Sequence, residues 1–176
     1  MEQTFSLRTS RLRLRAMEPE DLDFFYEVEN NTVLWCCGNS NVPYSRYALR
    51  RFLSESRNDL FADGQLRLVI EGCTGHEPLG CLDVMSFDPL HNRAEVGIVV
   101  VPHRQRDGIG KEAMQLLLSY LGNYLRLHQV YAYVSERNTA ACALFRSLEF
   151  TESARLADWL RLGDEHVAAL LFQKLF

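Results

Sequence analysis

The chain has 176 residues, 47% of them hydrophobic, and a formal net charge of −4. This size suits one α/β domain with a substantial core. The charge argues against a general nucleic-acid binder and is compatible with a cationic substrate. No apolar run reaches the roughly eighteen residues that a membrane helix needs, and the N-terminus does not resemble a secretion signal, so we expect a cytoplasmic protein without a membrane partner.

The first half of the chain is expected to begin with a half-exposed strand at residues 7–16, where leucines alternate with arginines. Pro19 fits the first turn of a helix that continues over residues 21–30. Residues 31–44 have the composition of a surface loop, and a second helix is expected over residues 45–63.

The second half is expected to contain a three-stranded meander, a long helix and a further strand. The predicted ranges are 66–71, 78–87 and 93–101 for the meander, 109–127 for the helix and 130–134 for the strand. A strand, a helix and a strand in succession imply a parallel crossover. A last helix and a hairpin complete the chain.

Cysteine and histidine residues do not form a metal or disulfide pattern. The cysteines are odd in number and lack a C-x-x-C pair, and the histidines are scattered, so we expect reduced thiols and no metal site. His91 is expected in a turn, and Cys142 is expected to be packed in the interior. The remaining cysteines are Cys36, Cys37, Cys73 and Cys81, and the remaining histidines are His76, His103, His128 and His166.

The segment 93–110, RAEVGIVVVPHRQRDGIG, joins a strand to a helix through a loop of basic and glycine residues. Pro102 ends the strand because it lacks a backbone donor. Gly108 and Gly110 stand where the helical spacing of apolar residues begins. A helix start offers unpaired N–H groups and a positive dipole end, and glycine lets a phosphate approach them, so this segment predicts an anion cradle.

Two common nucleotide motifs fit this cradle poorly. A P-loop needs a hydroxyl residue where this chain has Glu112, so no side chain would reach a magnesium ion. The dinucleotide pattern is formally met by Gly108, Gly110 and Ala113, with Glu136 as a ribose partner. About 66 residues follow the motif, which is short for the second half of a doubly wound sheet.

The pattern Gln105-x-x-Gly108-x-Gly110 resembles the pyrophosphate loop of the GNAT superfamily of acyl-CoA-dependent N-acyltransferases. A second segment, residues 138–150 (NTAACALFRSLEF), is similar to another motif of that family, and it follows at a matching distance. The strand at residues 7–16 and a closing hairpin at residues 155–172 extend the resemblance over nearly the whole chain.

The resemblance implies a single domain, residues 1–176, of the mixed α/β (α+β) class. It implies a mostly antiparallel sheet of about seven strands with flanking helices and one splayed parallel pair. It also implies acetyl-CoA as cosubstrate, no metal, a small-molecule amine as partner and a homo-oligomer as an open alternative. The residues implied to bind the cosubstrate are Val99, Val100, Val101, Gln105, Arg106, Asp107, Gly108, Ile109, Gly110, Lys111, Asn138 and Phe145.

Glu95 is the candidate catalytic base. An alkyl amine has a pKa near 10.4, so presenting it unprotonated at pH 7 costs roughly 4 to 5 kcal/mol. Glu95 lies on the predicted strand on the same face as Gly97, which leaves room beside it. Some family members use a glutamate here. The structural alternative is a surface ion pair of Glu95 with Arg93 or Arg13.

Two positions depart from the family pattern. Many relatives have a tyrosine as general acid where this chain has Phe145, which leaves solvent or Tyr131, Tyr133 or Tyr44 as alternatives. Glu149 replaces the usual glycine of a left-handed turn, which predicts either local strain or a different turn.

Other polar residues of the two motifs have two interpretations each. Asn138 is expected to cap the following helix or to contact pantetheine, or both. Arg104, Arg106 and Lys111 are candidate phosphate ligands or solvated cations.

The acceptor is expected to be a small amine such as a polyamine or diamine, because the motif segments resemble bacterial spermidine or diamine acetyltransferases. Acidic residues that could receive a second ammonium group are Glu27, Glu29 and Asp83, with Trp35 and Tyr44 as further substrate candidates. The alternatives are a ribosomal-protein-type N-terminal acetyltransferase, which shares the opening strand, and a non-catalytic acyl-CoA-binding module.

Overall fold

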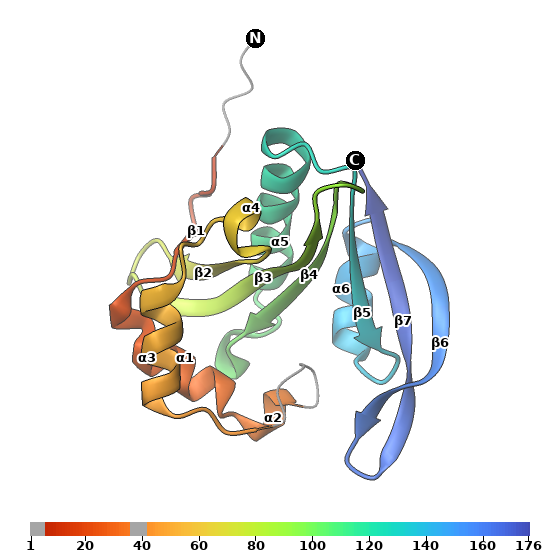
Figure 1. Cartoon of the computed structure of the whole chain (residues 1–176), viewed down its shortest axis with the longest axis horizontal. Coiled ribbons are helices and arrows are strands. Elements are labelled where there is room, and N and C mark those ends of the chain that lie inside the picture. The colour runs from red at the N-terminus through yellow and green to blue at the C-terminus, as the bar shows by residue number, and fades with distance from the viewer. Residues whose placement is uncertain (1–5, 36–41) are drawn as a thin grey trace. The chain divides into compact units, whose positions relative to one another are not determined.

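The computed structural model describes residues 6–35 and 42–176, which form two compact units (Figure 1). The first unit comprises Met1–Met17, Arg57–Tyr131 and Leu175–Phe176, and the second comprises Glu18–Ser56 and Ala132–Lys174. Both units are assembled from separated segments, so neither is a continuous stretch of chain. The organisation of residues 1–176 as one domain stays a prediction.

The strands form one seven-stranded sheet in the order β1-β2-β3-β4-β5-β7-β6, which confirms the expected mixed architecture. The strands are β1 (Leu12–Ala16), β2 (Leu66–Gly72), β3 (Pro78–Asp88), β4 (Arg93–Val100), β5 (Gln129–Ser135), β6 (Thr151–Leu162) and β7 (Glu165–Leu175). The helices are α1 (Leu22–Glu29), α2 (Thr32–Trp35), α3 (Arg46–Glu55), α4 (Leu60–Asp63), α5 (Ile109–Ser119) and α6 (Thr139–Ser147).

In the first unit, β2 to β4 form the predicted antiparallel meander, and β1 pairs antiparallel with β2 at its edge. Alternate residues point to one apolar face, on which Leu68 and Leu82 are buried. Helix α5 contacts β1, β3 and β4 and buries Ile109, Ala113 and Leu117, at the spacing of one helix face (Figure 1). Burial of a leucine or isoleucine side chain of this set contributes about 1.5 to 3 kcal/mol. The opposite face of these strands carries charged residues.

The expected parallel crossover is confirmed, because α5 connects β4 to β5 and these two strands pair in parallel. The paired residues are Arg93 with Gln129, Ala94 with Val130 and Glu95 with Tyr131. Beyond these three pairs the ladder ends, within the described part of the chain. From Val96 to Val100, β4 is therefore paired with β3 on one side and is not paired with β5 on the other.

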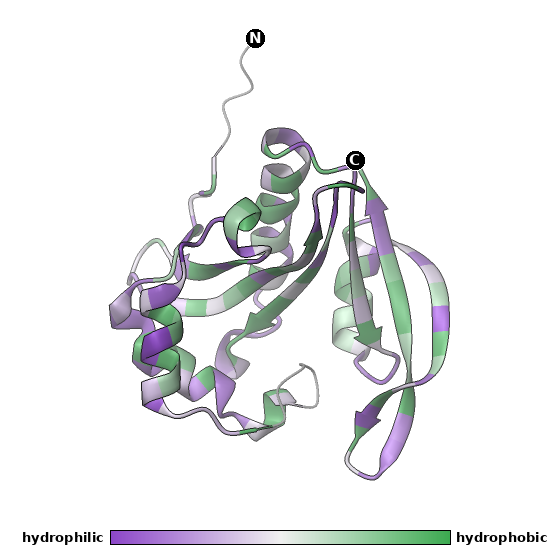
Figure 2. Ribbon diagram, viewed as in Figure 1, coloured by the Kyte–Doolittle hydropathy of each residue, from purple (hydrophilic) through white to green (hydrophobic). Residues whose placement is uncertain are grey.

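In the second unit, α6 packs against β7. Phe145 stacks on Phe172 with ring centroids 5.6 Å apart, and the Lys174 ammonium donates to the Leu148 carbonyl oxygen at 2.8 Å. The middle of β7 is mostly hydrophobic, whereas hydrophilic and hydrophobic residues alternate along β6 (Figure 2). The helices α1 and α3 of the same unit contact each other.

The single helix expected over residues 45–63 is wrong. Helix α3 ends at Glu55 and α4 begins at Leu60. Between them Asn58 has a φ of 53°, a left-handed conformation that a continuous helix cannot contain. Asp59 then caps α4 by accepting hydrogen bonds from the amides of Phe61 and Ala62. Asn and Asp favour such positions, so the sequence carried a signal for this break.

Other predicted boundaries also change. The first strand begins at Leu12 rather than at residue 7, and the range 31–44 contains the short helix α2, while residues 36–41 of it lie outside the described residues. The long helix ends at Ser119 in a wider turn, in which the Leu125 amide donates to the Tyr120 carbonyl. The hairpin is longer than expected at both ends.

Candidate active site

A loop with two left-handed residues leads from β4 into α5. Gly108 has a φ of 80° and forms the N-cap of α5, and Arg106 has a φ of 68°. The N-cap residue has no side chain that could bond the first amides of the helix. These amides and the helix dipole therefore form a backbone cradle suited to an anion such as a phosphate.

A hydrogen bond and an ion pair hold this loop in place. The Arg11 guanidinium donates to the Asp107 carbonyl oxygen at 2.9 Å, and Arg104 Nε lies 3.3 Å from the Asp107 carboxylate. Asp107 thus holds the loop through both its backbone carbonyl and its carboxylate. Arg106 and Lys111 are exposed and make no ion pair within residues 6–35 and 42–176. These two cations remain available to a phosphate.

The backbone of β4 is only partly available to a ligand. The Val101 amide donates to the Leu79 carbonyl at 3.0 Å, so Val101 and Val99 direct their backbone groups toward β3. Alternation along the strand then directs the N–H and C=O groups of Ile98 and Val100 to the opposite side. Of the three valines implied to pair with pantetheine, only Val100 presents its backbone to the open edge.

Gln105 lies at the same edge. Its side-chain amide donates to the Val100 carbonyl oxygen at 3.0 Å. This contact satisfies a carbonyl group that β5 does not pair. The glutamine of the loop motif is thereby linked to the strand edge where a cosubstrate arm would bind.

Glu95 lies at the last rung of the β4–β5 ladder and is half-buried. Burial raises the pKa of its carboxyl group, and a hydrogen bond from the Ser86 hydroxyl partly opposes this effect. The ion pair considered as an alternative role for Glu95 is not formed. Arg93 instead lies 3.3 Å from the Asp88 carboxylate, and Arg13 pairs with Glu71.

Strand register places Glu95 on a charged face of the first unit. Residue Gly97 follows on this face and is paired in register with Asp83, which in turn is paired with Arg67. The Arg67 guanidinium donates to both Asp83 oxygens, at 2.5 and 3.2 Å. Asp83, a substrate candidate from the sequence, is therefore already neutralised by a neighbouring cation.

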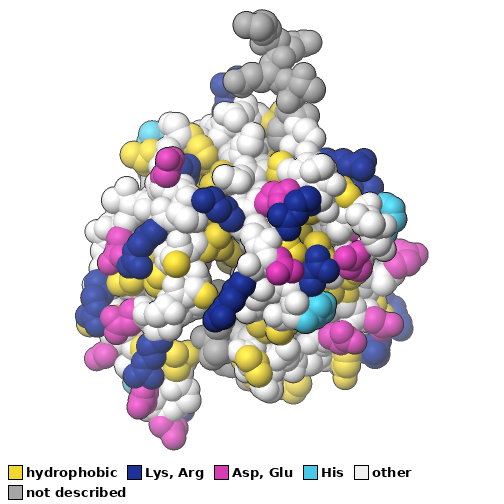
Figure 3. All heavy atoms as spheres, turned by 180° about the vertical axis from the view of Figure 1, so that it is seen from behind, with side chains coloured by type: hydrophobic (Ala, Val, Ile, Leu, Met, Phe, Trp, Pro, Cys, Tyr) yellow, Lys and Arg dark blue, Asp and Glu magenta, His cyan; other side chains and the backbone are white. Residues whose placement is uncertain are grey.

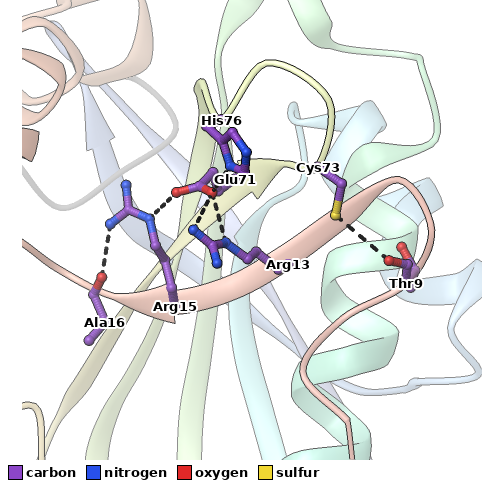
Figure 4. A network of polar contacts seen from close by, with 7 residues as sticks. All are labelled: Thr9, Arg13, Arg15, Ala16, Glu71, Cys73 and His76. Atoms are coloured by element: carbon purple, nitrogen blue, oxygen red, sulfur yellow. Dashed lines mark hydrogen bonds and ion pairs between the residues drawn. The ribbon is translucent and has the colours of Figure 1, made fainter.

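Glu71 occupies the far end of the same face and was not expected from the sequence. It is only 3% exposed, and Arg13, Arg15 and His76 converge on its carboxylate (Figure 4). Burial alone would raise the pKa of Glu71, but the hydrogen bonds from His76, Arg15 and Arg13 outweigh it and lower the pKa to about 2. The arginines that alternate along β1 were the sequence signal for this network.

The second unit contains the asparagine motif. Asn138 Oδ1 accepts a hydrogen bond from the Ala141 amide at 3.0 Å, which confirms its role as the cap of α6. Cys142 is buried, as expected. Glu149 has a φ of 64°, so of the two alternatives the left-handed turn is kept rather than replaced by a different one, and the Glu149 carboxylate lies 3.5 Å from Lys174.

Phe145 is part of the core of the second unit. It is 3% exposed and contacts Phe150 edge-on, with ring centroids 5.0 Å apart. The ring has no proton to donate. Of the tyrosines considered as alternatives, Tyr131 pairs in register with Glu95, whereas Tyr133 stacks on Trp159 at 6.0 Å.

The other substrate candidates lie around the end of α1 in the second unit. Asn30 holds Tyr44 by two hydrogen bonds, one from its side chain to the Tyr44 carbonyl at 3.0 Å and one from the Tyr44 amide at 2.8 Å. The Trp35 indole donates to the Glu29 carbonyl at 2.6 Å. Glu27, on the same helix, is exposed. The structure thus gathers four of these candidates at one helix end.

Acidic and basic side chains are interspersed on the molecular face shown in Figure 3, without a broad region of one sign. Among residues 6–35 and 42–176, no group of three metal-binding side chains is found. No helix in that part of the chain has the length and hydrophobicity needed to cross a membrane. His91 lies in the turn before β4, as expected, and its amide donates to Asp88.

Comparison with known proteins gives consistent matches. The model of the acetyltransferase (GNAT) domain family matches residues 11–151. A spermidine N(1)-acetyltransferase of Escherichia coli K12 is 27% identical over 82% of this chain and 75% of its own, and the uncharacterized N-acetyltransferase p20 of Bacillus licheniformis is 28% identical over 97% and 96%. The crystal structure of spermidine N-acetyltransferase from Vibrio cholerae in complex with CoA and spermine shares the fold, with a TM-score of 0.86, 23% identity and coverage of 95% and 96%.

Proposed function

The chain belongs to the GNAT acetyltransferase family, an acyl-CoA-dependent group of enzymes that use acetyl-CoA, and we propose that its acceptor is a primary amine of a polyamine or diamine. The dinucleotide and non-catalytic alternatives are thereby set aside. Glu136, the ribose candidate of the dinucleotide alternative, instead binds Arg155 through two hydrogen bonds.

Glu95 carries the catalytic part of this proposal. Its carboxyl group is half-buried, lacks a cationic partner within the described residues and has a raised pKa, so it suits a group that accepts a proton and later releases it. The amine nitrogen attacks the thioester carbon, a C–N bond forms and the C–S bond breaks. The proton lost by the ammonium passes to Glu95, directly or through water, and the thiolate leaves.

The departing thiolate needs little help, since a thiol pKa near 8.5 makes it a tolerable leaving group. If a tyrosine assists, Tyr131 is the candidate because it shares a ladder rung with Glu95. Tyr131→Phe should then lower kcat at least about tenfold. Tyr133→Phe is the matched control, and equal rates for Tyr131→Phe and the parent enzyme would assign the proton to solvent.

The preference for a polyamine rests on the two named spermidine acetyltransferases and on the acidity of the second unit near α1. Glu27 is exposed and Glu29 is half-buried at the helix end that holds Trp35 and Tyr44. Carboxylates and aromatic rings together suit a second alkylammonium group. Asp83 is a weaker candidate because Arg67 already binds it.

A CoA-release assay over five kinds of acceptor tests the proposal. Spermidine and a linear diamine should react faster than a monoamine of equal chain length, aminoglycosides and peptides with a free N-terminus. Glu27→Gln should reduce the diamine-to-monoamine ratio of kcat/KM about fivefold, as expected for one ion contact. Glu20→Gln, in the exposed turn before α1, is the control. Turnover of peptides without turnover of spermidine would establish the N-terminal acetyltransferase alternative instead.

A further inference from the structure

The turn that leads into β1 fixes the backbone of Arg11. The Thr9 hydroxyl oxygen accepts hydrogen bonds from the amides of Arg11 and Leu12, both at 3.1 Å. The Arg11 carbonyl accepts a hydrogen bond at 2.9 Å from the amide of Cys73, which follows β2, and the Cys73 thiol lies 3.7 Å from the Thr9 carbonyl oxygen (Figure 4). Arg11 therefore extends from an ordered backbone, although its side chain is 55% exposed.

The guanidinium of Arg11 connects the loop after β4 with the first turn of α5. One terminal nitrogen donates to the Asp107 carbonyl oxygen at 2.9 Å, and the other lies 3.4 Å from the Glu112 carboxylate. The second oxygen of this carboxylate accepts a hydrogen bond from the Thr9 hydroxyl. A methyl group built on Gly108 would lie 3.9 Å from the guanidinium, so Arg11 stands beside the N-cap of α5.

The charges around the cradle are balanced in pairs. Asp107 and Glu112 are the two carboxylates of this segment, and each lies beside one arginine, Arg104 for Asp107 and Arg11 for Glu112. The two exposed cations of the loop and helix start are therefore left for an anion. Without Arg11, the Glu112 carboxylate would oppose an anion bound at the same helix end.

From this arrangement we infer that Arg11 is a positioning residue for the cosubstrate. Its bond to the Asp107 carbonyl holds the left-handed turn through Gly108, so that the first amides of α5 face the pyrophosphate of acetyl-CoA. Its second contact offsets the charge of Glu112. A guanidinium suits both tasks because its planar fork can meet two acceptors at once. The inference rests on the cradle as the pyrophosphate site and is independent of which amine is the acceptor.

Steady-state kinetics with two acetyl donors tests this role. Arg11→Ala should raise the KM for acetyl-CoA about tenfold and change kcat less than about twofold, because the contact serves binding at a distance from the thioester. With acetyl-pantetheine, which lacks the pyrophosphate, KM should equal that of the parent. Arg11→Lys keeps the charge but not the fork, so it should raise the KM for acetyl-CoA about threefold. Arg8→Ala, an exposed arginine of the same segment, is the control.

A second substitution tests the charge balance. Adding Glu112→Gln to Arg11→Ala removes the uncompensated carboxylate, so it should recover about half of the loss in affinity on a logarithmic scale. No recovery would overturn this part of the inference. An unchanged KM for acetyl-CoA in Arg11→Ala, or an equal rise in KM with acetyl-pantetheine, would overturn it as a whole.

Measurements on the free protein separate positioning from direct contact. With glycine labelled by nitrogen-15, the amide signals of Gly108 and Gly110 should shift in Arg11→Ala and stay in place in Arg8→Ala. Unshifted signals with a raised KM would assign Arg11 a direct contact with phosphate and overturn the inference. Equal affinity of the parent protein for CoA and pantetheine in calorimetry would remove the cradle as the pyrophosphate site, whereas a preference for CoA that Arg11→Ala retains overturns the inference alone.

Discussion

Glu71 and Glu95 are glutamates on the same face of the first unit, yet their surroundings give them opposite properties. Glu71 is the more deeply buried, and two arginines and His76 bind its carboxylate and lower its pKa to about 2. Glu95 is half-buried, has no cationic partner among the described residues, and burial raises its pKa. The difference shows that local cations, rather than the depth of burial, decide which of the two carboxyl groups has the lower pKa.

Glu95→Gln should have the largest effect on activity. Loss of the base is expected to lower kcat/KM about 100-fold or more at pH 7, since general base catalysis typically contributes that much. The deficit should shrink as pH rises, because a growing fraction of the amine is then already neutral. Steady-state rates of both proteins between pH 6 and pH 10 measure this deficit and its pH dependence. Glu77→Gln is the control, and equal rates at neutral pH would exclude Glu95 as base.

Glu71→Gln should affect stability and leave the rate per folded molecule unchanged. Removing this carboxylate leaves Arg13 and Arg15 close together without their anion, and we expect a loss of about 2 to 3 kcal/mol in the free energy of unfolding. Urea denaturation measures it. A large loss of turnover in the folded variant would show that Glu71 contributes to catalysis as well as to stability.

Gly80→Ala and Gly97→Ala test two properties separately: the close approach of β3 to β4, and the use of the space beside Glu95. A methyl group at Gly80 would lie 2.1 Å from the Val99 carbonyl oxygen, so Gly80→Ala should force β3 and β4 apart and cost about 1 to 3 kcal/mol. At Gly97 the nearest atom is a methionine methyl carbon 3.6 Å away, an ordinary contact. Gly97→Ala should therefore keep its stability, as thermal denaturation would show, and any loss of turnover would indicate that the space is used.

The pH dependence of stability should differ in sign between the two glutamates. The pKa of Glu71 is lower in the folded protein, so its stabilisation is present above the unfolded value near 4.5 and is lost as pH falls toward 2. The pKa of Glu95 is raised, so its ionisation reduces stability as pH rises above that unfolded value. Unfolding curves from pH 3 to pH 7 should show that Glu71→Gln flattens the acid loss and that Glu95→Gln is slightly more stable than the parent at pH 7.

Features that depend on neighbouring residues in the chain could be predicted from the sequence. The end of β4 before Pro102, the helix start after Gly108, the cap at Asn138 and the left-handed turn at Glu149 all appear as expected. In each case the controlling interaction spans only a few residues, so the local sequence contains the necessary information.

Features that depend on strand register could not be predicted. Arg13 binds Glu71 across 58 residues of chain, and this pairing replaced the one considered with Glu95. The bulge in β3, in the register shift between Met85 and Asp88 next to the rung of Glu95, also had no local signal in the sequence. Register follows from packing the whole apolar face against α5, and a shift of one residue would move every charge to the other face.

The sequence by itself determined the family, the glycine at the start of α5 and the presence of a glutamate on the strand beside it, because these depend on motifs and on residue order. Only the tertiary structure decided which arginines neutralise Glu71 and Asp83, which backbone groups of β4 stay open, and that Glu95 lacks a cationic partner within the described chain. These properties arise from distances between segments far apart in the sequence, and those distances exist only once the strands are in register.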